Sequence, residues 1–301
     1  MSHPTQLDRT ARLADGRTLA YADLGDPRGP AVLYFHGSPG SRLEGQLLAP
    51  AATSHGLRLI AVDRPGFGRS DPKRDRALLD WPGDIEQLAD ALSLERFAVV
   101  GASGGGPYAA ACAYRLHARL FAAAIVCGVA PFAQTAATAR SEPGPEAILP
   151  PGVRRLLAVI RRAPWLPAVA VLPVILAMRH RPDRALRHMK RFMPEPDRLA
   201  LDRPEVAAIF RESLPEALRQ GPRSAHTELM IYARPWGFDL ADIPIEVHVF
   251  QGELDRSVPV QMARSIAARI PRSRAVYFAD EGHFSIGINR AGEILGALRP
   301  A

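Results

Sequence analysis

The chain of 301 residues has few of the features that mark several large classes of protein. It has two cysteines, Cys112 and Cys127, and neither has another cysteine or a histidine at the usual ligand spacing. This argues against a disulfide framework and a zinc site. The longest apolar stretch, residues 163–178, is short for a helix that spans a bilayer and contains three prolines. We therefore expect two buried thiols, no metal or other cofactor, and no stable membrane insertion.

Other absences narrow the functional classes further. The first ten residues lack the basic segment and apolar run of a secretory signal, so a cytoplasmic location is expected. The sequence has neither the Lys-Ser or Lys-Thr of a phosphate-binding loop nor the three-glycine spacing of a dinucleotide fold. We therefore do not expect a nucleotide cofactor.

The net charge of +7 is confined to one part of the chain. Residues 131–235 contain seventeen basic and ten acidic side chains, and the remainder is neutral. Because these basic residues are scattered among prolines and form no recognisable nucleic-acid module, we expect a solvated surface and no nucleic-acid partner. The sequence leaves open whether this basic surface weakly attracts anionic substrates.

Short apolar runs alternate with helical patterns on both sides of the basic segment. An Asp15-Gly16 pair predicts a hairpin over residues 11–25. The alternation predicts an α/β fold with a mostly parallel central sheet and helices on both faces. Six runs have the length and composition of buried strands: 31–35, 59–62, 97–100, 120–126, 245–250 and 275–278.

Residues 131–235 interrupt this alternation. They hold fifteen of the 28 prolines, and their pattern favours short helices broken by proline, with no convincing strand. We interpret them as a helical cap inserted into a core made of residues 1–130 and 236–301. We expect the apolar stretch that begins at Trp165, together with Trp236 and Phe238, to line a substrate pocket; simple anchoring of the cap is the alternative.

A serine stands between a predicted strand and a predicted helix. The run 97–100 enters residues 101–105, GASGG, which match the G-x-S-x-G pattern in its strand–turn–helix context. The glycines let strand and helix approach closely, and the turn forces the serine into a strained backbone conformation. Ser103 is therefore the predicted nucleophile. A structural or phosphate-cradling turn is the alternative.

A serine at neutral pH needs a base, and two histidines stand at the ends of predicted strands. His283 follows a glycine after the last strand and is the predicted base. His36 stands after the run 31–35, where a histidine more often braces a loop by hydrogen bonding.

The base in turn needs a carboxylate that orients its ring. Asp255, after the run 245–250, is the predicted residue. Glu253 is the first alternative, and Asp280 is a weaker one. The strand end after 120–126 offers no carboxylate.

Together these motifs resemble the α/β-hydrolase-fold enzymes that carry a cap domain. The resemblance covers residues 11–130 and 236–300, and the chain order Ser-Asp-His is the order of that fold. It implies an oxyanion hole made by the backbone N–H groups of Ser38 and Gly104, with His36 and Gly37 beside the substrate pocket. The motifs that carry it are 36–40 (HGSPG), 63–70 (DRPGFGRS), 101–105, the pair Gly252 and Asp255, and the pair Gly282 and His283.

The resemblance implies a hydrolase that forms an acyl-serine. Dehalogenases and epoxide hydrolases of this fold would use an aspartate at the position of Ser103, which weighs against both. We predict cleavage of a carboxylic ester, or a related acyl bond, in a small and apolar acyl substrate. The alternatives are a proline iminopeptidase-like aminopeptidase, for which the cap is too basic, a lactone or carbon–carbon bond hydrolase, and a non-catalytic ligand receptor.

Overall fold

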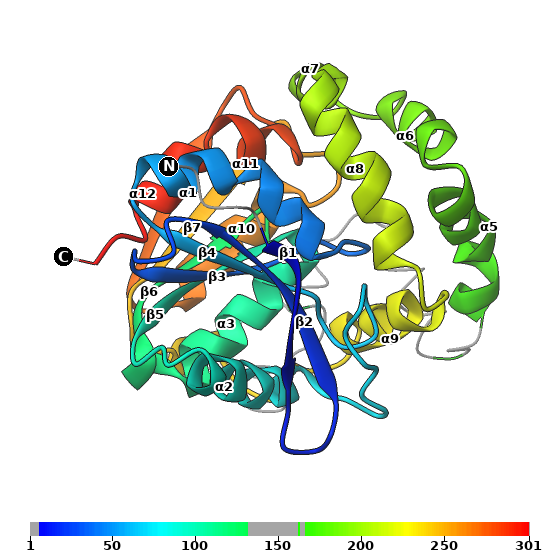
Figure 1. Cartoon of the computed structure of the whole chain (residues 1–301). Coiled ribbons are helices and arrows are strands. Elements are labelled where there is room, and N and C mark those ends of the chain that lie inside the picture. The colour runs from blue at the N-terminus through cyan, green and yellow to red at the C-terminus, as the bar shows by residue number, and fades with distance from the viewer. Residues whose placement is uncertain (1–5, 132–161, 163–165, 301) are drawn as a thin grey trace.

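A single eight-stranded sheet forms the centre of the molecule (Figure 1). The computed structural model describes residues 6–131, 162 and 166–300. The strand order is β1-β2-β4-β3-β5-β6-β7-β8, with antiparallel pairing at β1–β2 and β2–β4 and parallel pairing elsewhere, so the predicted mostly parallel sheet is confirmed. The strands are β1 (Gln6–Arg12), β2 (Thr18–Gly25), β3 (Ala31–Phe35), β4 (Arg58–Val62), β5 (Phe97–Ala102), β6 (Leu120–Val126), β7 (Val247–Gly252) and β8 (Ser273–Phe278).

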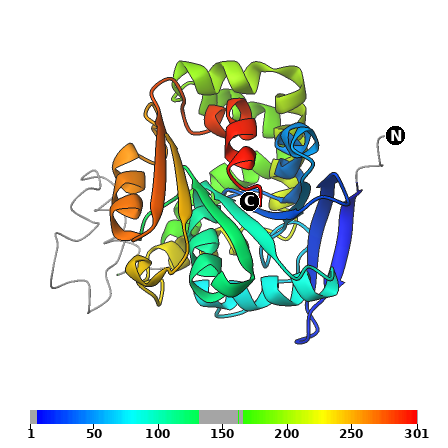
Figure 2. The same cartoon turned by 90° about the vertical axis from the view of Figure 1, so that its left-hand side faces the viewer.

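The predicted N-terminal hairpin is confirmed by β1 and β2. Gly16 in the connecting turn has a φ of +85°, a conformation that favours glycine. Figure 2 shows this hairpin, in blue, at one edge of the sheet, with β8 at the opposite edge.

Helices cover both faces of the sheet. Successive strand residues point to opposite faces, so Val99 packs on the side of α2, α3 and α10, whereas Val100 packs on the side of α1 and α12. The helices of the core are α1 (Ala49–Ser54), α2 (Trp81–Ala91), α3 (Gly106–Arg115), α10 (Val260–Arg269), α11 (Ser285–Asn289) and α12 (Ala291–Gly296), with a 3₁₀ turn, η1 (Arg42–Leu47), before α1.

The parallel strands bring their carboxyl ends to one edge of the sheet. Phe35 of β3 is in register with Gly101 of β5, and Gly252 of β7 is in register with Phe278 of β8. The loops that leave these four strands carry every predicted catalytic residue, so the sheet alone places them near one another.

Every described element between β6 and β7 is a helix, and these helices gather at one side of the sheet (Figure 1). Prolines stand in the first turns of α6, α7 and α8, as expected for residues that begin helices, but Pro173 and Pro215 lie inside α5 and α8. The cap helices are α5 (Leu166–His180), α6 (Pro182–Lys190), α7 (Glu195–Asp202), α8 (Pro204–Ala217) and α9 (Arg223–Tyr232).

The expected start of the cap, near residue 131, adjoins residues outside the described part, so that boundary stays a prediction. None of the described helices combines the length and the hydropathy needed to cross a membrane.

Candidate active site

Ser103 stands at the sharp turn between β5 and α3 and has a φ of +53°, a strained value for a residue with a side chain. The flanking glycines are required by close packing. A Cβ on Gly101 would lie 2.2 Å from the carbonyl oxygen of Gly105, and a Cβ on Gly105 would lie 2.2 Å from that of Phe35. The G-x-S-x-G pattern therefore follows from contacts that no larger residue permits.

Three of the predicted residues form one chain of hydrogen bonds. Nε2 of His283 lies 3.0 Å from Oγ of Ser103, and Nδ1 lies 2.7 Å from Oδ2 of Asp255. The backbone N–H groups of Ser257 and Val258 donate to the other oxygen of Asp255, which fixes the carboxylate. The arrangement has the geometry of a nucleophile, a base and an orienting carboxylate.

The two alternative carboxylates lie elsewhere. Glu253 and Asp280 are both exposed, and they pair with Arg264 and Arg290 respectively. Neither is hydrogen-bonded to His283.

The pKa values of the histidine and the aspartate move in opposite directions. Burial alone would lower the pKa of His283, but the Asp255 carboxylate beside it outweighs burial and raises the pKa above its ordinary value. Burial would raise the pKa of Asp255, yet His283 and the two backbone donors hold it below its usual range. Asp255 thus stays ionised and stabilises a positive charge on His283.

The two predicted oxyanion donors belong to neighbouring backbone segments. A Cβ on Gly104 would lie 2.9 Å from Cβ of Ser38. The carbonyl of Gly37 accepts a hydrogen bond from Arg64 at 3.1 Å, and that of Ser103 accepts from the N–H of Val129 at 3.3 Å. Because C=O and N–H point in opposite directions in a trans peptide, the N–H groups of Ser38 and Gly104 are directed away from these partners. No described residue accepts a hydrogen bond from either N–H group.

A buried charge cluster holds these segments in place. Glu228 of α9 pairs with Arg64, at 3.0 Å, and with Arg76, and also accepts from Tyr108 and Tyr232. Burial would raise the pKa of Glu228, but the two arginines outweigh it and lower the pKa to about 2.

Two members of the cluster reach the oxyanion segments directly. Arg64 donates to the carbonyls of His36 and Gly37, and the hydroxyl of Tyr232, whose one hydrogen is shared with Glu228, lies 2.8 Å from the carbonyl oxygen of Gly104. A single carboxylate of the cap therefore organises both segments that carry the predicted oxyanion donors.

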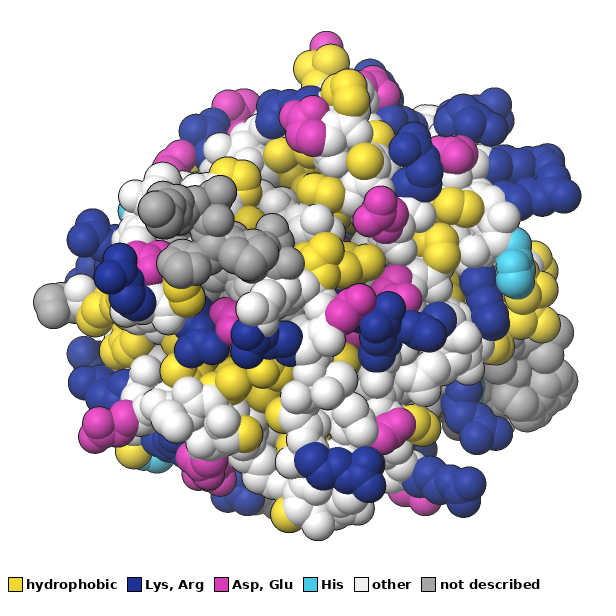
Figure 3. Space-filling model, in the orientation of Figure 1, with side chains coloured by type: hydrophobic (Ala, Val, Ile, Leu, Met, Phe, Trp, Pro, Cys, Tyr) yellow, Lys and Arg dark blue, Asp and Glu magenta, His cyan; other side chains and the backbone are white. Residues whose placement is uncertain are grey.

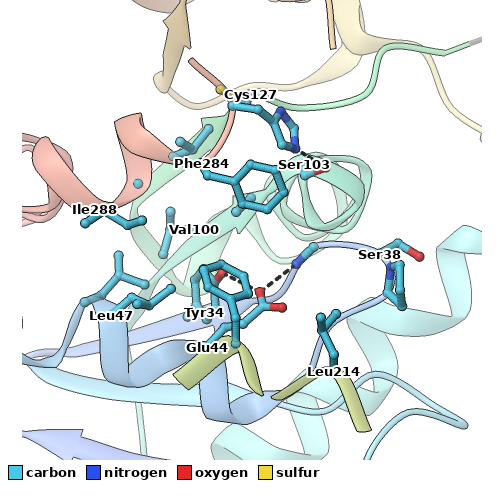
Figure 4. Close-up of a pocket in the computed structure, with 18 of the residues that line it drawn as sticks. Tyr34, Ser38, Glu44, Leu47, Val100, Ser103, Cys127, Leu214, Phe284 and Ile288 are labelled. Atoms are coloured by element: carbon cyan, nitrogen blue, oxygen red, sulfur yellow. Dashed lines mark hydrogen bonds between the residues drawn. The ribbon is translucent and has the colours of Figure 1, made fainter. Parts of the chain in front are cut away.

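An apolar pocket opens in front of Ser103 (Figure 4). Both the core and the cap contribute to its walls, and Gly37, Ser38, Ser103 and His283 also line it. Arg184 and Arg187 of α6, and Arg181 just before it, are exposed, and Figure 3 shows basic side chains on the surface at the upper right, where Figure 1 places α6. The apolar lining includes Leu47, Leu48, Val100, Phe284 and Ile288 from the core, and Met178, Leu186, Met189, Phe210 and Leu214 from the cap.

Comparison with known proteins supports the fold and its motifs. The sequence model of the family described as alpha/beta hydrolase fold matches residues 30–289. The chain belongs to this family. As an α/β-hydrolase, it shares its core with proteins of several different activities.

Three curated relatives illustrate this spread. The chain is 35% identical over 124 residues to a non-heme chloroperoxidase of Streptomyces lividans, which is 40% of this chain and 45% of that one. It is 32% identical to epoxide hydrolase B of Mycobacterium tuberculosis, over 35% of this chain and 31% of that one. It is also 32% identical to a proline iminopeptidase of Xanthomonas citri, over 34% of this chain and 33% of that one. The chain thus matches less than half the length of each relative.

Solved structures match over nearly the whole chain. The esterase RhEst1 of Rhodococcus sp. has a TM-score of 0.65 at 23% identity, covering 97% of this chain and 98% of that one. An enol-lactonase of Burkholderia xenovorans has a TM-score of 0.65 at 22% identity, covering 95% of this chain and 96% of that one. At these identities the likeness establishes the fold.

His36 was expected beside the pocket of this α/β-hydrolase, but it does not line that pocket. It is fully buried; its Nδ1 lies 2.7 Å from the carbonyl of Gly37, and its Nε2 accepts from the N–H of Arg64 at 3.1 Å. Burial and the Arg64 charge hold its pKa well below the ordinary value, so the ring is neutral and braces the loop. Gly37 lines the pocket, and its contact with a substrate stays a prediction.

The aromatic pair Trp236 and Phe238 also lies elsewhere. Both are buried in the hydrophobic cluster under α2, α3 and α10, and Phe238 stacks on Tyr114 of α3 with ring centroids 4.9 Å apart. They anchor the returning chain to the core, which was the alternative interpretation. Trp165 lies outside the described residues.

One cluster in the described part of the chain brings three potential metal ligands together: Cys127, Asp255 and His283. Burial keeps the pKa of the Cys127 thiol well above its ordinary value, so the thiol stays protonated. Asp255 and His283 already bond to each other. The donor set therefore favours the hydrogen-bonded triad over a metal site.

Asp197 of α7 connects the cap to the loop of the predicted base. Its Oδ2 accepts from the N–H of His283 at 3.0 Å, and its Oδ1 accepts from the N–H groups of Phe284 and Ser285, both at 2.9 Å. Asp197 is 1% exposed, and its charge contributes to the raised pKa of His283. The cap thus contacts the loop of His283 as well as lining the pocket.

The sequence interpretation missed Asp197, Glu228 and Glu44, all of which contact the site. The first two lie in a segment whose scattered charges look like a solvated surface, and all their partners except Tyr232 are 86 to 164 positions away in the chain. Arg64 lies two residues after the end of β4 and belongs to the motif 63–70, but that motif was used only for the family resemblance.

Replacing the central carboxylate of the cluster tests its structural role. In Glu228→Gln, Arg64 and Arg76 remain buried without a counter-charge, so the free energy of unfolding is expected to fall by about 3–5 kcal/mol. Urea denaturation followed by circular dichroism measures this. The control is Glu293→Gln, which removes an exposed pair with Arg290 and should change stability by about 1 kcal/mol or less. Equal stability of the two variants would contradict the assignment.

The effect of Asp197 on the pKa of His283 is measurable without a substrate. Because its carboxylate raises the pKa of His283, Asp197→Asn is expected to lower that pKa, as read from the imidazole signals in an NMR titration. Asp280→Asn, which removes an exposed charge paired with Arg290, serves as the control and should leave the titration unchanged. An unchanged His283 titration in Asp197→Asn would show that the cap does not act on the base.

Proposed function

We propose that this α/β-hydrolase is a serine hydrolase that cleaves a carboxylic ester, or a closely related acyl bond, through an acyl-serine intermediate. The observation that carries the proposal is the hydrogen-bond chain from Ser103 through His283 to Asp255, with the serine held in a strained turn. A strained serine within 3.0 Å of a histidine is typical of an activated nucleophile.

In the proposed reaction, Oγ of Ser103 attacks the carbonyl carbon while Nε2 of His283 takes its proton. The ionised Asp255 stabilises the resulting imidazolium, in agreement with the raised pKa of His283. The carbonyl oxygen becomes an oxyanion that accepts from the N–H groups of Ser38 and Gly104. Each donor is expected to stabilise the transition state by about 3 kcal/mol.

The tetrahedral adduct then breaks down to an acyl-serine, and the acyl-serine is hydrolysed in a second step. The carbon–oxygen bond to the leaving alcohol breaks, and His283 gives its proton to that oxygen. Water next attacks the acyl-serine with His283 as base, which releases the acid and restores Ser103. The peptide N–H groups keep their orientation throughout because Arg64 holds the Gly37 carbonyl and Val129 holds the Ser103 carbonyl.

The walls of the pocket support an apolar substrate. Leucine, methionine and phenylalanine side chains of α5, α6 and α8 face those of the core across the space in front of Ser103. Burying an alkyl chain there removes apolar area from water, which favours longer acyl or alcohol groups over acetate by about 0.8 kcal/mol per methylene.

An aminopeptidase is less well supported. Such an enzyme would use cap carboxylates to bind the substrate ammonium. Among the described carboxylates of the cap, those that are buried or half-buried, Asp197, Glu216 and Glu228, already bind backbone N–H groups or arginines. An epoxide hydrolase chemistry would need an aspartate where Ser103 stands.

Covalent labelling tests the proposal. The wild-type protein is expected to react with a fluorophosphonate probe and to hydrolyse p-nitrophenyl esters, with kcat/KM rising from acetate to octanoate. Ser103→Ala is expected to lose labelling and at least about 10⁴-fold in kcat/KM. Intact-mass spectrometry and release of p-nitrophenol measure the two effects.

Ser257→Ala is the matched control, because its exposed side chain lies close to the triad and only its backbone contacts Asp255. It should label and turn over like the wild type. Hydrolysis that persists in Ser103→Ala would contradict the proposed nucleophile, and equal rates on acetate and octanoate would contradict an apolar pocket.

A further inference from the structure

One acidic side chain lines the otherwise apolar pocket. Glu44, from the 3₁₀ turn η1 after β3, is 7% exposed and projects into the pocket beside Tyr34, Leu47 and Leu214 (Figure 4). Its Oε2 accepts from the hydroxyl of Tyr34 and from the N–H of Gly37, each at 3.2 Å. No described residue donates a hydrogen bond to its other oxygen, Oε1.

The carboxyl of Glu44 lies in largely apolar surroundings. Burial raises the pKa of Glu44 to about 7, against the opposing effects of the two donors and of Arg64. The carboxyl is therefore close to the balance between its neutral and ionised forms near neutral pH. Because Oε1 is not among the fully buried atoms that lack a partner, it is accessible from the pocket, and a bound molecule that covers it must supply a donor or leave the acceptor unpaired.

The carboxyl and the predicted nucleophile line the same pocket. A Cβ on Gly37 would lie 3.6 Å from Cβ of Ser103 and 4.0 Å from Oε2 of Glu44, so a single glycine separates the nucleophile from the carboxyl. The charge of Glu44 also contributes to the raised pKa of His283. Glu44 and Ser103 therefore line the same part of the pocket, on the two sides of Gly37.

We propose that Glu44 is a specificity-determining residue that binds a hydrogen-bond donor, a hydroxyl or an amino group, carried by the substrate within a few bonds of its reacting carbonyl. The inference rests on the proposed function and narrows it: the substrate class is an apolar acyl compound with a donor near the scissile bond. The donor fills the open Oε1, and the apolar walls bind the rest of the molecule.

The open Oε1 would also make the pocket discriminate between substrates with and without a donor. A plain alkyl substrate covers Oε1 without a partner and removes it from water, whereas a substrate with a donor replaces the lost hydration. Sites built to hydrogen-bond a substrate group reject analogues that lack it far more strongly than apolar pockets reject a missing methylene.

Matched ester pairs measure this preference. Ethyl 3-hydroxybutyrate and ethyl 3-aminobutyrate are compared with ethyl butyrate for a donor on the acyl side, and 2-hydroxyethyl butyrate with propyl butyrate for one on the alcohol side. We expect at least one donor-bearing ester to exceed its plain partner by at least about 10-fold in kcat/KM. The hydroxyl and amino arms identify which donor the site takes.

Glu44→Gln tests the assigned residue. The amide can still accept from Gly37, but its NH₂ group places a donor where the substrate donor would bind, so the kcat/KM ratio within the preferred pair is expected to fall to about 1. If Glu44 only braced the Gly37 loop, the variant would lower both rates and leave the ratio unchanged. Glu212→Gln, an exposed change on α8, is the control and should keep the wild-type ratio.

The outcomes separate this inference from the proposed function. Wild-type protein that labels with fluorophosphonate and hydrolyses both members of every pair equally, or a Glu44→Gln variant that keeps the preference, would overturn the role of Glu44 alone. Protein that neither labels nor hydrolyses any ester would overturn the proposed function, and the inference with it.

Discussion

The buried carboxylate of Glu228 is the charge on which the geometry of the site depends. It comes from the cap, and it is satisfied by Arg64 and Arg76 from the core. Since an unpaired charge at this depth would cost several kcal/mol, the cap and the core must meet in one arrangement. In that arrangement Arg64 holds the carbonyls after β3, and Tyr232 holds the carbonyl of Gly104. The ion pair thereby orients peptide groups that are not themselves charged.

The sheet supplies the second constraint. Parallel strands in register bring the loops after β5, β7 and β8 to one edge of the sheet. The glycines around Ser103 have no side chain, so β5 and α3 can approach each other closely. Asp197 then joins the cap to the loop of His283 through three backbone N–H groups. His283 is therefore held at its side chain by Asp255 of the core and at its backbone by Asp197 of the cap.

The sequence predicted what depends on local pattern. The strands at 31–35 and 120–126 have the expected bounds, and Ser103, Asp255 and His283 could be found because each follows a recognisable strand. The expected run 97–100 extends to Ala102 in the structure, since the last residues pair with β6 although they read as part of the turn. Trp236 and Phe238 were misplaced because a large apolar side chain fits a core and a pocket equally well. Glu44, Asp197 and Glu228 depend on tertiary contacts or burial that no local pattern signals.

The most direct test of the account is a crystal structure of the protein after reaction with a fluorophosphonate. The phosphonyl group is expected on Oγ of Ser103, with its oxygen about 2.7–3.1 Å from both the Ser38 and the Gly104 backbone nitrogens. An adduct on another residue, or a phosphonyl oxygen that faces neither N–H group, would contradict the claim that the Glu228 cluster orients these peptides for acyl transfer.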